Sequence, residues 1–411
     1  SFVTLLAYEW HSIAFGDHNV YYPGDGEIVE RGTLERLDEA LEGSGALVIP
    51  HHIGYGPGQR GIDWDHFDAH RSPVVEIFSG HGSSERDGGP YPMYHTMGPR
   101  SHRGTVAHGL ALGKRFGFVA GTDHHGGYPG HYGEGRTAVY AQELTRASLW
   151  EALRARRCYA VTGDKIELEF FVDDAFMGEE TAGSGRREVR LGIRGSDVLD
   201  RIVVVKNNRP LRRVFGPAPG EKLPDPLQAK VRLEWGWGDK NELVRWDGEA
   251  RLSVGEILSV EPCFSGEPVL APDDAHEAPT DESPIHGLTA QDERSVRWFS
   301  HTRGNPHPFL RGTSALVLEL SAPQRTELEL ELNGRQYRFR LEDLLEGSRS
   351  VFLRGWRSEA LLVHRAVPAY RYNLELAFED PEPEQEVDVY TLRVAQENDQ
   401  WAWASPIWVA S

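Results

Sequence analysis

Polar and apolar residues alternate with a period of two along much of the chain after residue 165, and this alternation limits the possible folds more than any other feature. Clear examples are residues 167–170 and 327–332. Successive side chains of a strand point to opposite faces, so the pattern indicates strands with one buried side. Asn207-Asn208 and Asn333-Gly334 each follow such a run and predict tight hairpin turns. This part of the chain is therefore expected to be mostly antiparallel and sandwich-like.

The first 165 residues have a different pattern, in which apolar runs alternate with charged segments. Residues 33–41 predict a helix that ends at Gly43, and Thr145 is expected to cap a second helix that reaches about residue 157. Short apolar runs predict buried parallel strands at residues 3–7, 46–49, 74–78 and 116–120. These features predict α/β architecture.

Three regions follow from these patterns. Residues 1–165 are expected to form an α/β metal-binding region, and residues 166–265 a β-sandwich-like region. Residues 266–411 form a second β-rich region, which either stands alone or completes the sandwich. An acidic, proline-rich segment from about residue 265 to 287 is expected to separate the last two.

Composition excludes several classes of protein. The 411 residues include 63 acidic and 44 basic side chains, a net charge of −19, which argues against a nucleic-acid partner. The absence of any apolar run near the roughly 20 residues that cross a bilayer predicts no membrane span. The two cysteines, Cys158 and Cys263, are too few for a disulfide framework or a cysteine-rich zinc motif, and they predict no particular compartment.

Histidine is concentrated in the first third of the chain, where 13 of the 18 histidines lie within residues 1–131. Imidazole is a common ligand for transition metals and a proton carrier near neutral pH. Ionisable residues in this third directly follow apolar runs, where they need partners that a shared metal could supply. They lie at residues 7–10 with 17–20, 49–52, 74–81 and 121–127.

Each of the earlier groups allows more than one interpretation. Glu9 is either a metal ligand or a carboxylate that accepts a hydrogen bond from a backbone turn. His18 either contacts a metal or substrate, or is a surface histidine. His51 and His52 are adjacent at one strand end, so their side chains are expected to point to opposite sides. One of the two would then bind metal while the other contacts substrate.

The later groups are interpreted in the same way. Asp123-x-His125 is the most specific metal-binding pair of the chain. Glu76 is expected to orient a histidine rather than bind metal directly. His81 lies in a loop rich in glycine and serine and is either functional or solvated, and His124 is expected to be a neighbour of the site rather than a ligand.

These motifs resemble those of two known groups of proteins. The successive metal-site motifs of the polymerase and histidinol phosphatase (PHP) superfamily are similar to residues 7–9, His18, 49–51 and 121–125. The PHP-like family catalogued as domain of unknown function 3604 is similar over nearly the whole chain, most clearly at residues 135–136, 144–146, 156–164 and 402–408.

The PHP resemblance implies the C-terminal part of a distorted (β/α)7 barrel with two or three metal ions at the C-terminal ends of its strands. It also implies phosphoesterase activity. Carried over by position, Glu9 would be the bridging carboxylate, His18 and either His51 or His52 would be further ligands, and Asp123 with His125 would close the site.

One departure from the superfamily pattern affects the metal site. PHP proteins begin with a His-x-His strand and an Asp-His motif, which cannot precede Glu9 here because the chain begins eight residues earlier. The chain would then hold only part of the site and the later strands of the barrel. An N-terminal fragment of the same protein is therefore an expected partner.

The expected reaction is hydrolysis of a small, phosphorylated substrate. Bound metal would lower the pKa of a water molecule and neutralise charge on the substrate, and N and O ligands are compatible with Mn²⁺, Zn²⁺ or Fe²⁺. A histidine outside the ligand set, namely His52, His81 or His124, could protonate the leaving group.

Three alternatives remain from the sequence. The same site could cleave an amide, ester or sulfate, because a fold does not determine the substrate. Ser1 could act as an N-terminal nucleophile. Alternatively, the protein could be a non-catalytic carbohydrate-binding or assembly protein that uses exposed tryptophans among Trp235, Trp237, Trp401, Trp403 and Trp408.

Overall fold

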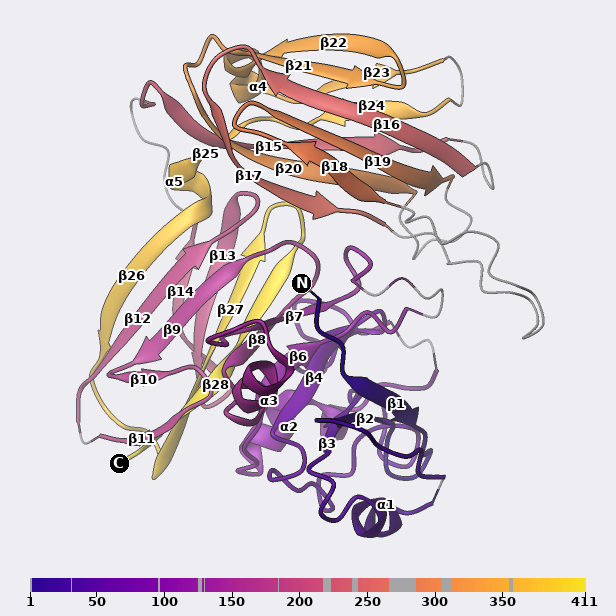
Figure 1. Ribbon diagram of the computed structural model, residues 1–411. Helices are drawn as coiled ribbons and strands as arrows, with labels where there is room; N and C mark the ends of the chain where they lie inside the picture. Colours follow the sequence, from indigo (N-terminus) through magenta and orange to yellow (C-terminus); the bar gives the residue numbers. More distant parts are fainter. Residues whose placement is uncertain are drawn as a thin grey trace, which may run out of the picture.

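The computed structural model is dominated by β structure, arranged as an N-terminal region and two β-sandwiches (Figure 1). The residues that it describes are 2–30, 32–94, 97–124, 128, 130–183, 185–216, 223–238, 243–265, 286–304, 312–354 and 358–411. Ser1, His125 and most of the proline-rich segment predicted near residues 265–287 lie outside these ranges.

The N-terminal region contains two small sheets. The first has the order β1-β2-β3 and is antiparallel throughout, with β1 at Leu6–Trp10, β2 at His18–Tyr22 and β3 at Leu47–Pro50. The second has the order β5-β4-β6, and its strands are β4 (Val74–Ser79), β5 (Gly82–Ser83) and β6 (Gly117–Ala120). The helical elements here are α1 (Leu34–Ala40), η1 (His102–Gly104), α2 (Val106–Ala111) and α3 (Arg146–Arg154).

The expected α/β architecture with part of a (β/α)7 barrel is wrong. The described strands form open sheets, and in the N-terminal region only β4 and β6 are parallel, whereas β1, β2 and β3 are antiparallel neighbours. Residues 11–17 connect β1 to β2, and this connection is too short for the crossover that two parallel strands require. Alternation of apolar runs and helices along the chain therefore does not produce a barrel here.

The first sandwich combines strands from the middle and the end of the chain. Its smaller sheet has the order β10-β9-β12-β26, with strands β9 (Glu167–Val172), β10 (Ala175–Phe176), β12 (Arg187–Arg194) and β26 (Asn373–Asp380). Its larger sheet has the order β14-β13-β27-β28-β8-β7, and β11 pairs with β28. These strands are β7 (Arg136–Val139), β8 (Cys158–Val161), β11 (Glu180–Ala182), β13 (Leu199–Lys206), β14 (Arg209–Phe215), β27 (Val387–Gln396) and β28 (Trp401–Ala410).

The second sandwich is built from residues between β14 and β26. One sheet has the order β17-β20-β15-β24-β23 with β25 beside β15, and the other has the order β18-β19-β16-β21-β22. The strands of the first are β15 (Leu227–Gly236), β17 (Glu256–Cys263), β20 (Thr313–Ala322), β23 (Arg349–Phe352), β24 (Ala360–Val363) and β25 (Val367–Pro368). Those of the second are β16 (Leu243–Leu252), β18 (Gly287–Gln291), β19 (Ser295–Arg303), β21 (Glu327–Leu332) and β22 (Arg335–Arg340), and the short helices are α4 (Leu341–Glu346) and α5 (Ala369–Tyr372).

Local sequence signals are confirmed where they depend on only a few residues. Both predicted hairpins form, and each two-residue turn has positive φ at both positions: 50° and 62° at Asn207-Asn208, and 50° and 75° at Asn333-Gly334. The hydroxyl of Thr145 caps α3 by accepting a hydrogen bond from the Ser148 N–H at 3.3 Å. Turn and cap chemistry is therefore readable without tertiary contacts.

Most of the tryptophans considered for carbohydrate binding are core residues. Trp235, Trp401, Trp403 and Trp408 are 0 to 3% exposed, whereas Trp237 is 44% exposed. Trp235 lies in the core of the second sandwich, where its ring stacks on Trp298. The buried rings stabilise the cores and are not available to stack on a sugar.

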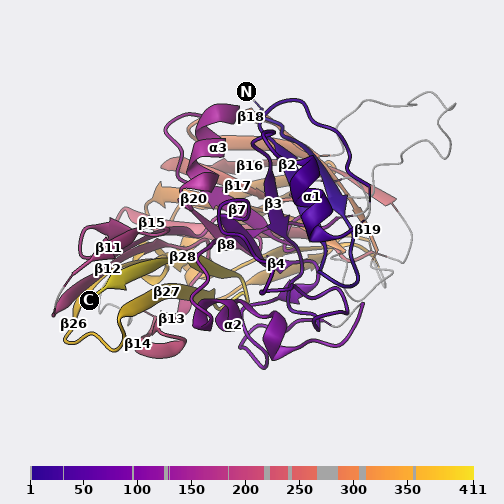
Figure 2. The ribbon, with the colours of Figure 1, turned by 90° about the horizontal axis from the view of Figure 1, so that it is seen from below.

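Strand β28 attaches the first sandwich to the N-terminal region. The ring of Trp403 stacks on Phe78 of β4, with centroids 5.7 Å apart. The Ser405 hydroxyl accepts a hydrogen bond from the Phe118 N–H of β6 at 2.8 Å and donates one to the Cys158 carbonyl of β8 at 2.6 Å. Figure 2 shows β8 and β28 beside β4 in the view from below. The end of the chain therefore supports the strands that carry the candidate site.

Asp164 is a buried polar junction between the three parts of the molecule. Its carboxylate is 0% exposed and accepts hydrogen bonds from the Tyr132 hydroxyl at 2.6 Å and from the amides of Gln396 and Asn398, each at 2.7 Å. Arg232 of the second sandwich lies 3.5 Å from the same carboxylate. A buried carboxylate needs such donors to replace its hydration.

We predict that Asp164→Asn lowers the free energy of unfolding by about 2–3 kcal/mol, because the new amide group turns a donor toward residues that are themselves donors. Urea denaturation followed by tryptophan fluorescence measures the change. Asp174→Asn, at an exposed position, is the control and should stay within about 0.5 kcal/mol of the parent. Equal stability of the two variants would contradict the role of Asp164.

Candidate metal centre

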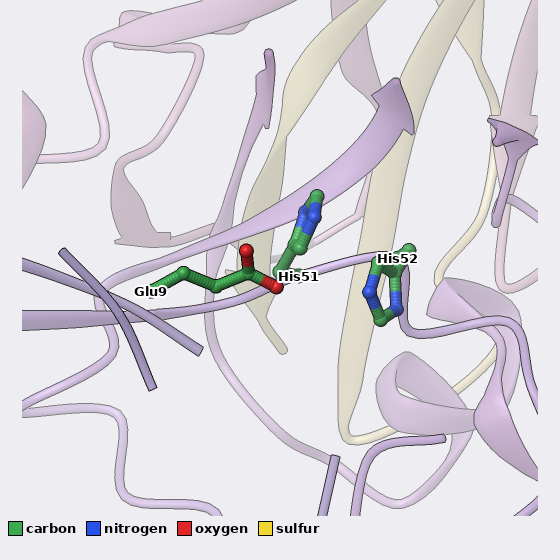
Figure 3. Close-up of side chains that lie close together, drawn as sticks. All are labelled: Glu9, His51 and His52. Atoms are coloured by element: carbon green, nitrogen blue, oxygen red, sulfur yellow. The ribbon is translucent and has the colours of Figure 1, made fainter. Parts of the chain in front are cut away.

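The strand ends of the N-terminal region bring ionisable side chains together. Glu9 is on β1, and His51 and His52 directly follow β3. Their ligand atoms all lie within 4.8 Å of one another. Figure 3 shows the Glu9 side chain extending toward the His51 ring, with His52 on the far side of His51. His51 and His52 are buried, whereas the Glu9 side chain is 29% exposed, so the group can be reached from solvent.

Glu76 of β4 holds both histidines in place. One carboxylate oxygen lies 2.8 Å from His51 Nδ1, and the other accepts a hydrogen bond from the His52 backbone N–H at 3.0 Å. Glu76 is only 4% exposed. Because an ionised carboxylate only accepts hydrogen bonds, the Nδ1 atom of His51 carries the proton and its Nε2 atom faces the centre.

The expectation that His51 and His52 point to opposite sides is wrong. Their ring centroids lie 4.0 Å apart, because β3 ends at Pro50 and His52 has a left-handed φ of 33°. Alternation of side chains holds only while the backbone stays extended. Backbone strain of this kind costs roughly 1–3 kcal/mol and is concentrated at functional sites.

Asp123 and His81 extend the group on one side. The Asp123 carboxylate lies 2.7 Å from His81 Nε2 and 3.5 Å from His51 Nε2. The other nitrogen of His81, Nδ1, lies 2.8 Å from the Tyr55 hydroxyl. Asp123 also has a left-handed φ, of 52°. His81 is therefore held between a hydroxyl and a carboxylate rather than being a solvated loop residue.

Asp17 is a member of the group that the sequence reasoning did not single out. Its carboxylate lies 3.3 Å from His52 Nε2, 3.2 Å from Arg60 and 3.5 Å from His11 Nδ1. Glu9, His11 and Asp17 form a second set whose ligand atoms lie within 4.8 Å of one another. The available signal was a carboxylate directly before an apolar strand, next to His18.

His52 has one ring nitrogen that no described residue satisfies. Its Nε2 atom faces Asp17, whereas Nδ1 is buried and has no hydrogen-bond partner among the described residues. Burial lowers the pKa of His52, so the ring is neutral near pH 7. With the proton on the side of Asp17, Nδ1 presents a free lone pair.

The charges of the centre shift the acidities of its members. Burial disfavours the charged ring of His51, but Glu76 and Asp123 outweigh it and hold the pKa of His51 well above the usual range. Burial also opposes ionisation of Asp123 and Asp17. The neighbouring His51 and His81 nevertheless hold the pKa of Asp123 far below its usual value, and His52, Ser12 and Arg60 lower the pKa of Asp17 to about 2. The carboxylates are therefore ionised and attract positive charge.

His18 lies beside this centre without joining either set. Its Nδ1 atom donates a hydrogen bond to the Gly16 carbonyl at 2.9 Å, and its charge would interact with His51 and His52. Within the described residues, the sets of close ligand atoms do not include His18. Burial lowers the pKa of His18 to about 4, so the residue is neutral at pH 7.

His124 belongs to a different cluster, and His125 lies outside the described residues. His124 Nδ1 lies 3.0 Å from Glu134, and His124, His131 and Glu134 form a separate set of close ligand atoms. The structure therefore brings together Glu9, His51, His52, His81 and Asp123 of the expected site, with His18 at its border and His124 elsewhere.

Comparison with known proteins identifies relatives of unknown function. A family model described as "Protein of unknown function (DUF3604)" matches residues 130–189. This match supports the resemblance to that family. The DUF3604 segment contains β7, α3, β8 and β9 together with Asp164, whereas Glu9, His51, His52 and Asp123 lie before it.

Three uncharacterized chlamydial proteins are similar to part of the chain. The protein of Chlamydia pneumoniae is 35% identical over 176 residues, which cover 38% of this chain and 28% of the relative. That of Chlamydia muridarum (strain MoPn / Nigg) is 32% identical over 172 residues, with the same two shares. That of Chlamydia trachomatis serovar D is 37% identical over 131 residues, which cover 29% of this chain and 21% of the relative.

The chain thus spans little more than a quarter of the length of the first two relatives. No solved structure matches the chain. Among the described helices, none is both long and apolar enough to cross a membrane.

We predict that the metal-free protein loses stability as the pH falls from 6.5 toward 4. The pKa of His18 is about 4 in the folded protein and near 6.5 when unfolded, so over this range only the unfolded chain binds the proton. The stabilising contribution is complete above pH 6.5, and roughly 3 kcal/mol is lost by pH 4.

Urea denaturation across this pH range in the presence of EDTA measures the effect. The Asn side chain of His18→Asn can still donate a hydrogen bond to the Gly16 carbonyl. In this variant the pH dependence of the free energy of unfolding should correspond to about one proton fewer taken up on unfolding. The control is His70→Asn, because the His70 side chain is exposed, and it should retain the parent slope. A His18→Asn profile parallel to that of the parent would contradict the buried, neutral His18.

Proposed function

We propose that the protein is a metal-dependent hydrolase whose substrates are small phosphoesters. One observation carries the proposal: the neutral His52 has a buried Nδ1 atom without a hydrogen-bond partner in the described part of the chain, and His52 belongs with Glu9 and His51 to a set of close ligand atoms. Buried polar atoms are almost always satisfied, so an unsatisfied nitrogen on a residue of this set indicates a ligand.

The donor atoms fit a divalent ion. Glu9, His51 and His52 would hold one ion, and Glu9, His11 and Asp17 would hold another, with Glu9 as a carboxylate shared by both. Asp123 and His81 border the first set. A further ion there would bring the number to three. Nitrogen and oxygen donors without a thiolate favour Mn²⁺, Zn²⁺ or Fe²⁺.

The electrostatics of the centre support the same proposal. The pKa of His51 is raised because its ring lies between the carboxylates of Glu76, at Nδ1, and Asp123, at Nε2. A divalent cation would supply positive charge on the Nε2 side instead, while His51 Nδ1 keeps its proton and donates it in the hydrogen bond to Glu76.

Bound metal would supply an activated water near neutral pH and a counter-charge for a phosphoryl oxygen. The protein residues have separate tasks. Glu76 orients His51 and His52 through its two oxygens, and Asp17 fixes the ring of His52. These contacts prevent rotation of the imidazoles and so maintain the geometry of the site.

His81 is suited to move a proton. It lies between the Tyr55 hydroxyl and the Asp123 carboxylate, and its side chain is 13% exposed. With Asp123 ionised, His81 can hold a proton on Nε2 and deliver it to the leaving-group oxygen of a substrate. Tyr55 then orients the ring rather than reacting itself.

The choice of phosphoesters depends on the resemblance of the Glu9, His51 and Asp123 motifs to those of the PHP superfamily. The net charge of −19 does not oppose an anionic substrate, because the charge of bound metal dominates the field at short range. We propose small phosphoesters rather than nucleic acids, because the acidic composition of the chain disfavours binding of a nucleic acid.

The test is hydrolysis of p-nitrophenyl phosphate by protein that has been stripped of metal and reloaded with Mn²⁺, Zn²⁺ or Fe²⁺. We expect activity that depends on the added metal, and a loss of at least about 100-fold in kcat in His52→Ala and Asp123→Asn. His70→Ala is the matched control, because it removes an imidazole from the surface, and it should keep the parent activity.

p-Nitrophenyl sulfate and p-nitrophenyl acetate are measured in parallel. Metal-dependent cleavage of only one of these would retain the hydrolase and reject the phosphoester. Absence of stoichiometric metal binding in the folded protein would reject the hydrolase and favour a binding or assembly role.

A further inference from the structure

A second cluster of buried imidazoles lies at the boundary between the N-terminal region and the second sandwich. It consists of His124, His131 and Glu134, whose ligand atoms all lie within 4.8 Å of one another. The ring of Tyr128 contacts both His131 and His286, and His286 directly precedes β18 of the second sandwich. We infer that this cluster is a separate zinc-type metal site that is independent of the centre at Glu9.

The spacing of the donor atoms suits a tetrahedral ion. His124 Nδ1 lies 3.0 Å from Glu134 Oε2, and His131 Nε2 lies 3.9 Å from Glu134 Oε1. Zinc bonds of about 2.0–2.1 Å at tetrahedral angles separate neighbouring ligand atoms by about 3.4 Å. The two separations lie on either side of this value, so small side-chain rotations would close the site around an ion.

Burial distinguishes this cluster from an ordinary surface group. The side chains of His124 and His131 are 7% and 3% exposed, and that of Glu134 is 18% exposed. The two imidazoles stack with an interplanar angle of 14° and centroids 4.6 Å apart. Stacked rings of this kind can direct nitrogen atoms of both histidines toward the same carboxylate.

One nitrogen of the buried His124 ring is unsatisfied, which costs free energy. Its Nε2 atom is buried and has no hydrogen-bond partner in the described ranges, a situation that costs roughly 1–3 kcal/mol. Among the described residues, the ring places Nδ1 beside Glu134 and its face against His131. Buried polar atoms are almost always paired, so the His124 ring has a nitrogen left for a further ligand or partner.

The ligand types point to the kind of ion. Two imidazoles and one carboxylate are a common set of three protein ligands for Zn²⁺, with a fourth position for water or a bound molecule. Within the described chain, the two sets of donors at Glu9 share no residue with this cluster. The inference therefore does not depend on the proposed hydrolase, and either site could exist without the other.

The experiment counts metal ions and uses the full chain. Metal-free protein is titrated with Co²⁺, which reports four-coordinate nitrogen and oxygen sites by visible absorption, and bound Zn²⁺ is measured by elemental analysis after dialysis. Compared with the parent, His131→Ala should lose one metal equivalent together with part of the absorption. Glu134→Gln, which has nearly the same shape, should bind that equivalent about 10–100-fold more weakly.

Two further variants separate this site from the first. His51→Ala should lose metal at the centre near Glu9 but keep the equivalent that depends on His131. His70→Ala, the exposed control, should bind as many ions as the parent. Loss of metal in His131→Ala without loss in His51→Ala would support this site and contradict the proposed hydrolase centre.

The inference is overturned if His131→Ala and Glu134→Gln retain every equivalent at parental affinity. It is also overturned if His51→Ala abolishes all binding, because the two sites would then be one. Circular dichroism and the unfolding temperature check that each variant is folded. Should His131→Ala fail this check, the affinity of Glu134→Gln decides the question.

Discussion

The carboxylate of Glu76 is the group on which the candidate metal centre depends. One oxygen bonds the His51 ring at 2.8 Å, and the other bonds the His52 backbone at 3.0 Å. A buried carboxylate must be fully paired, and these two bonds provide that pairing while they determine the directions of two adjacent imidazoles. The strained φ of His52 is tolerated because its N–H is held in this way. Geometry and charge at the centre thus have a common origin.

The sandwich provides the rigid support for this arrangement. Trp403 of β28 stacks on Phe78, two residues after Glu76, and its indole N–H donates a hydrogen bond to Glu85 at 3.0 Å. Glu85 also forms an ion pair with Arg393 of β27. The segment from Phe78 to Glu85, which carries His81, is therefore held at both ends by contacts with the first sandwich. A site assembled from loops becomes precise when packed side chains hold those loops.

Features that depend on residues close in sequence were predictable from the sequence, whereas features that depend on distant residues were not. The Asn333-Gly334 turn and the Thr145 cap were predictable because each depends on residues close in sequence. That Glu9, His51 and Asp123 have ionisable neighbours was predictable because ionisable groups beside apolar strands need partners. The antiparallel direction of β1 relative to β2 was not predictable, because an apolar run does not encode whether the neighbouring strand is parallel or antiparallel. The proximity of the His51 and His52 rings depended on the end of β3 and on Glu76, which is 24 residues away from His52.

By itself, the sequence determined the antiparallel β character after residue 165, the tight turns, and the supply of histidines and carboxylates in the first third of the chain. Tertiary structure decided which of them meet: Asp17 with His52, His81 with Asp123, and His124 with Glu134 rather than with the Glu9 group. The physical reason is that composition and periodicity reflect burial and backbone geometry, which are local. A metal site requires donor atoms a few ångströms apart, and only the packing of distant strands can bring them together.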